Sequence, residues 1–280
     1  MSEPLVSEHA KEVARGERFK FGENWSRFLG VLNDERIFEA EKSLKEMLGV
    51  EDLGGKSFLD IGSGSGLFSL AARRLGAARV HSFDYDPQSV ASTRELKRRY
   101  FPDDPDWTVE EASVLDRNYL ESLGKFDIVY SWGVLMMTGD MWRALEYAAL
   151  PVADDGRLFV AIYNDQGAIS KLWRSIKRLY LSGTPGRILA WALFIPYFVF
   201  GALATDLLRG RSPVARYAEY KRSRGMSIVH DWRDWLGGYP FEVAKPEEVF
   251  EFYRDRGFVL EKLITAGGEV GNNQFVFAKQ

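Results

Sequence analysis

The chain has 280 residues, with 37 Lys and Arg against 40 Asp and Glu, a formal net charge of −3, and no cysteine. This length suffices for a buried core and is near the size at which one domain acquires a second lobe. The charge balance offers no general attraction to nucleic acid. The lack of cysteine excludes disulfides, thiolate zinc sites and cysteine nucleophiles, and favours a cytoplasmic location.

The first 49 residues are predicted to form a helical lead-in. The stretch of residues 1–25 is charged and has no apolar run, so it does not resemble a secretory signal. Further along, Ile37, Ala40 and Leu44 repeat at helical spacing, and Gly49 provides a stop.

Short apolar runs alternate with helical segments from residue 50 to residue 165. Strands are expected in "KSFLDIGSG", "RVHSFDYD", "WTVEEASVLD", "FDIVYSWGV" and "GRLFVAIYND". After residue 240 the chain reads as one helix, "KPEEVFEFYRDRG", followed by two strands in "FVLEKLITAGG" and "NNQFVFAKQ". This alternation predicts an α/β fold with a doubly wound, mostly parallel seven-stranded sheet.

The rhythm breaks between residues 166 and 239, which are predicted to form an apolar, aromatic, helical insertion or cap after the fifth strand. The core would then consist of residues 50–165 and 240–280. Residues 188–204 contain no charged side chain. This run is short for a spanning helix, which needs about 20 apolar residues. A cap over the site is the favoured interpretation, and an interfacial helix at residues 186–208 stays open as the alternative.

A glycine-rich turn follows the first predicted strand in "FLDIGSGSG". The strand ends at Asp60, and Gly62, Gly64 and Gly66 allow the backbone to turn tightly and approach a ligand before the next helix. Asp84 ends the following strand, where a carboxylate can accept two hydrogen bonds from a ribose diol. The two features together predict a site for an adenosine-containing cofactor.

This run, with Asp84, resembles the first two motifs of class I S-adenosylmethionine-dependent methyltransferases. The resemblance covers residues 50–165 and implies a Rossmann-like core, S-adenosyl-L-methionine as cofactor and S-adenosylhomocysteine as product. It implies that Asp60 lies near the amino-acid end of the cofactor and that residues 112–115 flank the adenine. Relatives often have Gly-Asp where this chain has Ala112 and Ser113. The cofactor contacts expected from this resemblance are Asp60, Gly62, Ser63, Gly64, Gly66, Asp84, Tyr85, Ser113, Val114, Ser131 and Trp25.

The loop after the fourth strand departs from a pattern common in this family. Many small-molecule methyltransferases have "GVLHH" there, whereas this chain has "GVLMM" with Met136 and Met137. Histidine can act as a base near neutral pH, but methionine cannot. We expect Met136, Met137 and Trp132 to line the substrate pocket as adaptable apolar groups. Whether the pair is natural or altered stays open.

The catalytic candidates come from the fifth strand and the insertion. Tyr163 and Asn164 follow that strand at the ligand edge of the sheet, and His230 in "IVHDWRDW" is ranked first among the bases. No cluster has convincing metal-ligand spacing, so no metal is expected.

These patterns predict methyl transfer to a small, partly hydrophobic acceptor by an enzyme located in the cytoplasm. Peripheral contact with the inner membrane and a homo-oligomer stay open. One alternative is a cofactor-binding protein whose catalysis is lost. The other is an NAD-dependent oxidoreductase, which is disfavoured because Leu67 stands where a dinucleotide fingerprint has its third glycine. The acceptor atom, whether oxygen, nitrogen or carbon, is not determined.

Overall fold

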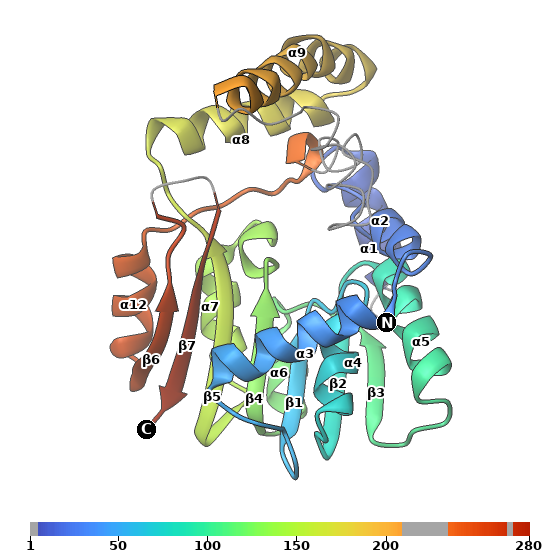
Figure 1. The fold of residues 1–280 in the computed structure, drawn as a ribbon, viewed down its shortest axis with the longest axis vertical. Coiled ribbons are helices and arrows are strands. Elements are labelled where there is room, and N and C mark those ends of the chain that lie inside the picture. Colours follow the sequence, from blue (N-terminus) through green and yellow to red (C-terminus); the bar gives the residue numbers. More distant parts are fainter. Residues whose placement is uncertain (1–4, 209–234, 268–270) are drawn as a thin grey trace.

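The computed structural model describes residues 5–208, 235–267 and 271–280. One seven-stranded sheet forms the centre, with the order β3-β2-β1-β4-β5-β7-β6. Figure 1 shows this order across the lower half of the molecule, with β6 at one edge and β3 at the other. The predicted fold class is confirmed. The strands are β1 (Ser57–Ile61), β2 (Arg79–Asp84), β3 (Trp107–Glu111), β4 (Phe126–Trp132), β5 (Val152–Tyr163), β6 (Phe258–Ile264) and β7 (Asn272–Lys279).

The sheet is parallel through its first five strands and antiparallel at β7 and β6. Parallel neighbours need crossover helices, whereas the final antiparallel pair does not, so the seven residues 265–271 suffice to join β6 to β7. The helices are α1 (Leu5–Ala14), α2 (Gly22–Phe28), α3 (Asp34–Leu48), α4 (Leu67–Arg74), α5 (Pro87–Tyr100), α6 (Arg117–Ser122), the 3₁₀ turn η1 (Leu135–Met137), α7 (Met141–Ala149), α8 (Ala168–Leu181), α9 (Thr184–Leu208) and α12 (Pro246–Arg254).

Two hydrophobic cores cover the two faces of the sheet. Neighbouring strand residues point to opposite faces, so Phe58 packs with α3, α4 and α5, while Leu59 packs with α6, α7 and α12. Helix α3 starts at Asp34, because the Asn33 side chain accepts a hydrogen bond from the backbone N–H of Arg36 and caps it.

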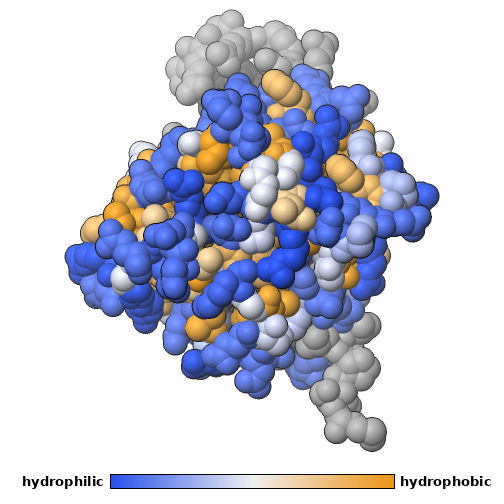
Figure 2. Space-filling model, turned by 90° about the horizontal axis from the view of Figure 1, so that it is seen from below, coloured by the Kyte–Doolittle hydropathy of each residue, from blue (hydrophilic) through white to orange (hydrophobic). Residues whose placement is uncertain are grey.

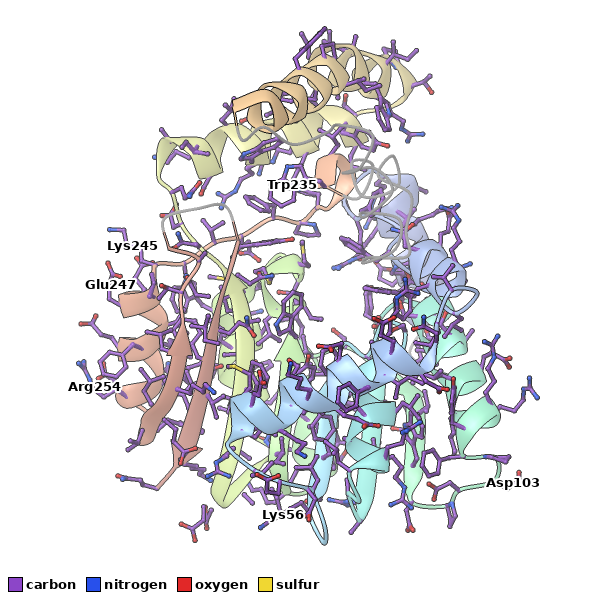
Figure 3. The ribbon with its side chains drawn as sticks, in the orientation of Figure 1. Lys56, Asp103, Trp235, Lys245, Glu247 and Arg254 are labelled. Atoms are coloured by element: carbon purple, nitrogen blue, oxygen red, sulfur yellow. The ribbon has the colours of Figure 1, made fainter. Side chains whose placement is uncertain are left out.

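A third hydrophobic cluster lies above the carboxyl ends of the strands and joins the lead-in to the segment after β5. We call it the cap cluster. Figure 3 shows one of its neighbours, Trp235, directly beneath α8. None of the described helices is long and apolar enough to cross a membrane. The buried members of the cap cluster are Phe19, Trp173, Ile176, Tyr180, Ala190, Leu236 and Phe241.

Candidate cofactor and acceptor site

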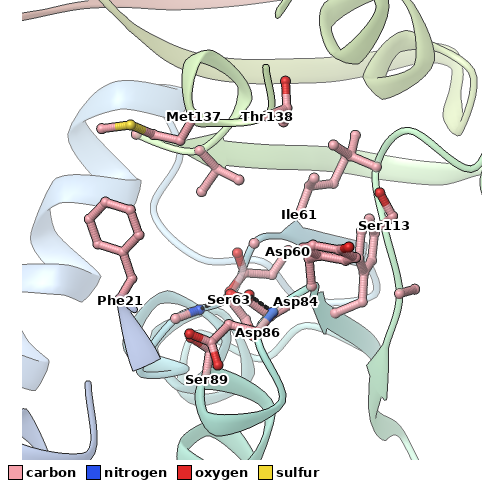
Figure 4. A pocket seen from close by; sticks show the side chains of 18 of the residues that line it. Phe21, Asp60, Ile61, Ser63, Asp84, Asp86, Ser89, Ser113, Met137 and Thr138 are labelled. Carbon is pink, nitrogen blue, oxygen red and sulfur yellow. Dashed lines mark hydrogen bonds between the residues drawn. The ribbon is translucent and has the colours of Figure 1, made fainter. Parts of the chain in front are cut away.

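A pocket of about 950 Å³ opens at the carboxyl ends of β1, β2 and β4. The strand order reverses between β1 and β4, since β2 follows β1 on one side and β4 lies on the other. Such a switch point leaves a crevice above the sheet, where ligands of open α/β folds bind. Figure 4 shows this pocket, with Phe21 and Met137 on one side and Ser113 on the other.

The glycine turn forms the floor of the pocket and accepts no other residue at two positions. Gly62 has φ +77°, and a Cβ there would come within 2.4 Å of Val134 Cγ1. Gly64 has φ +56°, and its Cβ would lie 3.0 Å from the indole ring of Trp25. Both the left-handed conformation and the close neighbours require glycine. Trp25 therefore packs directly over the turn, in the place where sequence analysis expects a cofactor contact.

Asp84 connects the turn to the loop after β2. Its two carboxylate oxygens accept hydrogen bonds from the backbone N–H groups of Gly64 and Asp86, each at 2.9 Å. Burial raises the pKa of Asp84 to about 6. Each carboxylate oxygen has two lone pairs, so this side chain keeps acceptor capacity for the hydroxyl groups of a ribose.

Asp60 lies deeper, at the end of β1. Burial raises the pKa of its carboxyl group to about 7, although the Ser69 hydroxyl donates a hydrogen bond to it and opposes that shift. The hydroxyl of Tyr130, which also lines the pocket, is buried without a hydrogen-bond partner among the described residues. An unpartnered buried hydroxyl is costly unless a ligand satisfies it. The residues therefore fit a ligand with a polar end at Asp60 and a ribose at Asp84.

The residues predicted to flank the adenine also line the pocket. Ser63 and Tyr85 line the pocket, and so do the four consecutive residues Ala112, Ser113, Val114 and Leu115. The hydroxyl of Ser113 accepts a hydrogen bond from the backbone N–H of Leu115, which fixes this turn.

The lead-in closes the pocket through contacts that sequence analysis missed. Arg18 donates hydrogen bonds to the backbone carbonyls of Met137 at 3.0 Å and Thr138 at 3.3 Å, and its Nε lies 2.6 Å from a carboxylate oxygen of Glu12. Its guanidinium also lies over the ring of Tyr85, 4.9 Å from the centroid. One side chain thereby joins the lead-in to two walls of the pocket.

A second anchor holds the lead-in to the start of α5. The Asp86 carboxylate accepts hydrogen bonds from the backbone N–H groups of Gly22 and Gln88, and its Oδ2 lies 3.7 Å from Nε2 of His9. A Cβ at Gly22 would lie 2.7 Å from this carboxylate. Burial lowers the pKa of His9, so its imidazole is neutral at pH 7. Sequence signals for the contacts of Asp86 with Gly22 and His9 are weak, because these partners are more than 60 positions apart.

The structure corrects the placement of one of the two methionines. Met137 lines the pocket, but Met136 is fully buried in the core of the α7 face and does not reach it. The two residues belong to the 3₁₀ turn η1, so successive side chains point in different directions. The backbone carbonyl of Met136 accepts a hydrogen bond from the backbone N–H of Glu242 and ties the turn to the segment before α12.

Three further predicted residues lie away from the pocket. Gly66 begins α4 and packs against Thr93, where a Cβ would come within 2.9 Å. Ser131 is buried and donates to the backbone carbonyl of Ile61, because the alternation of β4 turns it into the sheet interior. The Asn164 side chain accepts from Asn273 instead of facing the ligand. These three positions support the site without lining it.

The other end of the pocket is apolar and aromatic, and we call it the acceptor end. Tyr163, at the end of β5, lines it, and burial raises the pKa of its phenol to about 12. The side-chain oxygen of Asn272, on the neighbouring strand, is buried without a partner in the described chain. The residues of the acceptor end are Phe19, Phe21, Trp132, Met137, Tyr163 and Asn272.

His230 lies outside the described residues, so its predicted role as a base stays a prediction. Within residues 5–208, 235–267 and 271–280 no group of three or more His, Cys, Asp or Glu side chains could hold a metal ion.

Sequence similarity to known proteins is found in the part of the chain that contains the glycine turn and Asp84. The family model described as ribosomal protein L11 methyltransferase matches residues 42–129. A protein of that name from Methylococcus capsulatus is 52% identical over 54 residues, which cover 19% of this chain and 18% of that protein. One from Aeromonas hydrophila is 41% identical over 78 residues, 25% of this chain and 26% of that protein. The matched segments thus span at most about a quarter of these relatives.

Solved structures share the fold over most of the chain. Magnesium protoporphyrin IX methyltransferase from Synechocystis with bound S-adenosylhomocysteine has a TM-score of 0.56 and 13% identity, with 96% of this chain and all of that chain covered. PKMT2 from Rickettsia typhi in complex with the same product has a TM-score of 0.53 and 15% identity, with 86% and 52% covered. Identities this low indicate a shared architecture and leave the acceptor to be argued from the site.

Proposed function

We propose that the chain is a class I S-adenosylmethionine-dependent methyltransferase and that it transfers a methyl group to a small, partly hydrophobic acceptor. The observation that carries the proposal is one continuous pocket that joins the glycine turn to the acceptor end. Its volume of about 950 Å³ is near the upper limit of ligand pockets, roughly 1,000 Å³. It therefore offers room for a cofactor and an acceptor together.

The proposal assigns the cofactor to the residues that follow β1, β2 and β3. Asp84 binds the ribose hydroxyls, residues 112–115 flank the adenine, and Asp60 and Tyr130 face the amino-acid end. Residues 50–165 and 240–280 then form the cofactor-binding core, and residues 166–239 form a cap. The position of Trp25 over Gly64 supports a role for the lead-in in enclosing the cofactor.

The reaction requires positioning more than acid–base chemistry. A lone pair of the acceptor atom attacks the methyl carbon in line, the carbon–sulfur bond breaks, and its electron pair leaves on sulfur, which converts the sulfonium to a neutral thioether. Exclusion of water and correct alignment lower the barrier of such a displacement. Because the Tyr163 pKa is raised, its phenol stays protonated at neutral pH and acts as a hydrogen-bond donor to the acceptor.

The named relatives act on a protein, but that acceptor does not follow for this chain. The family match ends at residue 129. Trp132, Met137 and Tyr163, which line the acceptor end, all come after that residue. The similarity therefore supports the cofactor half and does not extend to the acceptor half.

Radiolabelled methyl transfer tests the proposal. The purified chain is incubated with labelled S-adenosylmethionine and a cell extract, and the label is measured separately in organic-soluble small molecules and in acid-precipitated protein. We expect label in the small-molecule fraction, and none with Asp84→Ala as the control. Label confined to protein would contradict the small-molecule acceptor.

A cofactor-binding protein without turnover is the second candidate, favoured by Met137 at the place where many relatives have histidine. Calorimetric binding of S-adenosylhomocysteine with no labelled product in any fraction would support it. Met137→His then restores a titratable group in the pocket, and Met137→Leu is the matched control. Gain of turnover in the histidine variant alone would indicate lost catalysis.

A further inference from the structure

Helix α9 is hydrophobic around its whole circumference. It has 25 residues, and residues 188–204 within it contain no charged side chain. A helix of this composition is normally buried in a core or in lipid, whereas a surface helix has one apolar stripe and one polar face. The position of α9 in the structure is therefore unexpected.

Among the described side chains of α9, those that are buried lie on one side of the helix. Ala190 is fully buried in the cap cluster, where α9 contacts α8. On the other side the exposed fractions are 64% for Ile188, 56% for Leu193 and 66% for Phe200. Figure 1 shows α9 as the outermost element, at the end of the molecule farthest from the sheet. A contiguous apolar surface of this kind marks an interaction site.

Helix α8 extends this apolar surface and borders it with basic groups. Its inner face packs Trp173 and Ile176 into the cap cluster, while Ile169 and Leu172 are 50% and 59% exposed. The face seen from below in Figure 2, at the opposite end of the molecule, is mostly hydrophilic with hydrophobic residues interspersed. The apolar surface therefore belongs to one end of the protein.

The charged residues between positions 166 and 205 are all basic. Although the whole chain has a formal charge of −3, residues 166–205 contain five basic residues and no acidic one. These basic residues are Lys171, Arg174, Lys177, Arg178 and Arg187. Lys171, Arg178 and Arg187 are exposed, whereas Arg174 is half-buried and Lys177 is buried against Trp235. Basic groups beside an apolar helix surface match the chemistry of a bilayer with anionic headgroups.

We propose that α8 and α9 bind the surface of an anionic lipid bilayer, with α9 in the plane of the interface. Ile188, Leu193 and Phe200 would enter the boundary between headgroups and acyl chains, and Lys171 and Arg187 would contact the headgroup phosphates. This surface is separate from the glycine turn, so the proposal does not depend on methyl transfer.

A second copy of the chain fits this surface less well. A two-fold interface brings the same patch of both copies together, so the exposed Lys171, Arg178 and Arg187 would face their counterparts, and residues 166–205 supply no acidic side chain to offset them. Lysine is also depleted in the centres of protein interfaces. An anionic partner satisfies both the apolar and the basic groups.

Vesicle sedimentation tests the proposal. Binding of the full chain is measured with neutral phosphatidylcholine vesicles and with vesicles that also contain phosphatidylglycerol, at low and at high salt. We expect binding to anionic vesicles that exceeds binding to neutral ones at least tenfold and weakens with salt. Equal binding to both compositions, or none, would overturn the proposal.

A matched pair of variants assigns the binding to α9. Phe200→Asp and Phe38→Asp introduce the same charge at side chains that are 66% and 61% exposed, on α9 and α3. We expect Phe200→Asp to reduce vesicle binding at least tenfold and Phe38→Asp to change it less than twofold. Equal effects would contradict the assignment. So would a dimer, seen by light scattering without lipid, that only Phe200→Asp dissociates while vesicle binding persists. Unchanged far-UV circular dichroism spectra and Tm values verify that both variants are folded.

Discussion

Individual residues of the cofactor turn are constrained by space and by desolvation. Gly62 is fixed by its backbone conformation and by Val134 above it. Asp60 and Asp84 are fixed by burial, which raises the pKa of both carboxyl groups. Burial of such carboxyl groups lowers the free energy of unfolding. Ionisable side chains with shifted pKa values that line a cavity are typical of binding sites.

The close approach at Gly62 predicts a specific loss on substitution. Gly62→Ala should destabilise the protein by about 2–4 kcal/mol through the left-handed backbone and the clash with Val134, and should abolish binding of S-adenosylhomocysteine. Gly49→Ala is the control, because Gly49 has φ +65° with no atom within 4 Å of a Cβ. It should cost only about 1 kcal/mol and bind normally. Chemical denaturation and calorimetry measure both effects, and equal losses would contradict the steric argument.

The raised pKa of Asp60 predicts a pH-dependent stability. Between the ordinary aspartate pKa of 3.8 and the folded-state pKa of about 7, the folded state keeps a proton that the unfolded state has released. The free energy of unfolding should therefore fall as pH rises from about 4 to 7. Asp60→Asn should remove this penalty and stabilise the ligand-free protein above pH 7 by up to about 4 kcal/mol.

Denaturation at pH 5 and pH 8 measures this effect, with exposed Asp103→Asn as the control. Asp103 has φ +58°, a conformation that asparagine also tolerates. An equal change in the pH dependence of the free energy of unfolding for Asp60→Asn and Asp103→Asn would contradict the predicted penalty at Asp60. Asp60→Asn should also weaken cofactor binding, because the substitution removes the carboxylate expected at the amino-acid end.

At the scale of elements, the lead-in forms one wall of the pocket. Arg18 spans from the lead-in to η1, and Asp86 holds Gly22 at the other end. These contacts tie the lead-in to two walls of the pocket. We expect that a bound ligand is retained in part by these contacts.

Weakening the Arg18 contact should accelerate ligand release. Arg18→Lys keeps the charge opposite Glu12 but loses the guanidinium fork that reaches two carbonyl oxygens. We expect roughly tenfold faster dissociation of S-adenosylhomocysteine in stopped-flow experiments, the equivalent of one lost hydrogen bond. Arg15→Lys, which alters an exposed ion pair with Glu17, is the control. Identical rates would mean that the lead-in does not retain the ligand.

At the scale of the whole molecule, ligand binding should couple to global stability. The pocket is built from both sheet faces and from the lead-in, and its ligand would bind the folded state only. At a concentration of 100 times Kd such a ligand contributes about 2.7 kcal/mol.

We expect S-adenosylhomocysteine at that concentration to raise the Tm by about 5–10 °C. NAD at the same concentration should leave the Tm unchanged, and Asp84→Ala should lose the shift with the product. Differential scanning calorimetry measures all three. A larger shift with NAD than with the product would restore the oxidoreductase alternative.

The fold and the cofactor turn could be predicted because their signals are local. Alternation of periods 2 and 3.6 identifies strands and helices within a few residues, and the connection rules then limit the sheet to few topologies. Asp60, Gly62, Gly64 and Asp84 lie within 25 positions of one another. Their spacing alone brings them to one edge of the sheet.

The acceptor end could not be predicted, since long-range packing decides it. Met136 and Met137 are neighbours with the same side chain, but one enters the core and the other lines the pocket. The direction of each methionine side chain depends on η1 and on the segment before α12, which lies over 100 positions away in the sequence. His9, Arg18 and Phe21 reach the pocket only because the lead-in folds back over it.

The amino-acid sequence by itself therefore determined the α/β class, the sheet and the cofactor turn of this protein, because each follows from local periodicity and from backbone freedom at glycine. Only the tertiary structure decided which side chains close the pocket, and that α9 presents an apolar surface instead of burying it. These properties depend on contacts between distant segments, and no short stretch of sequence encodes such contacts.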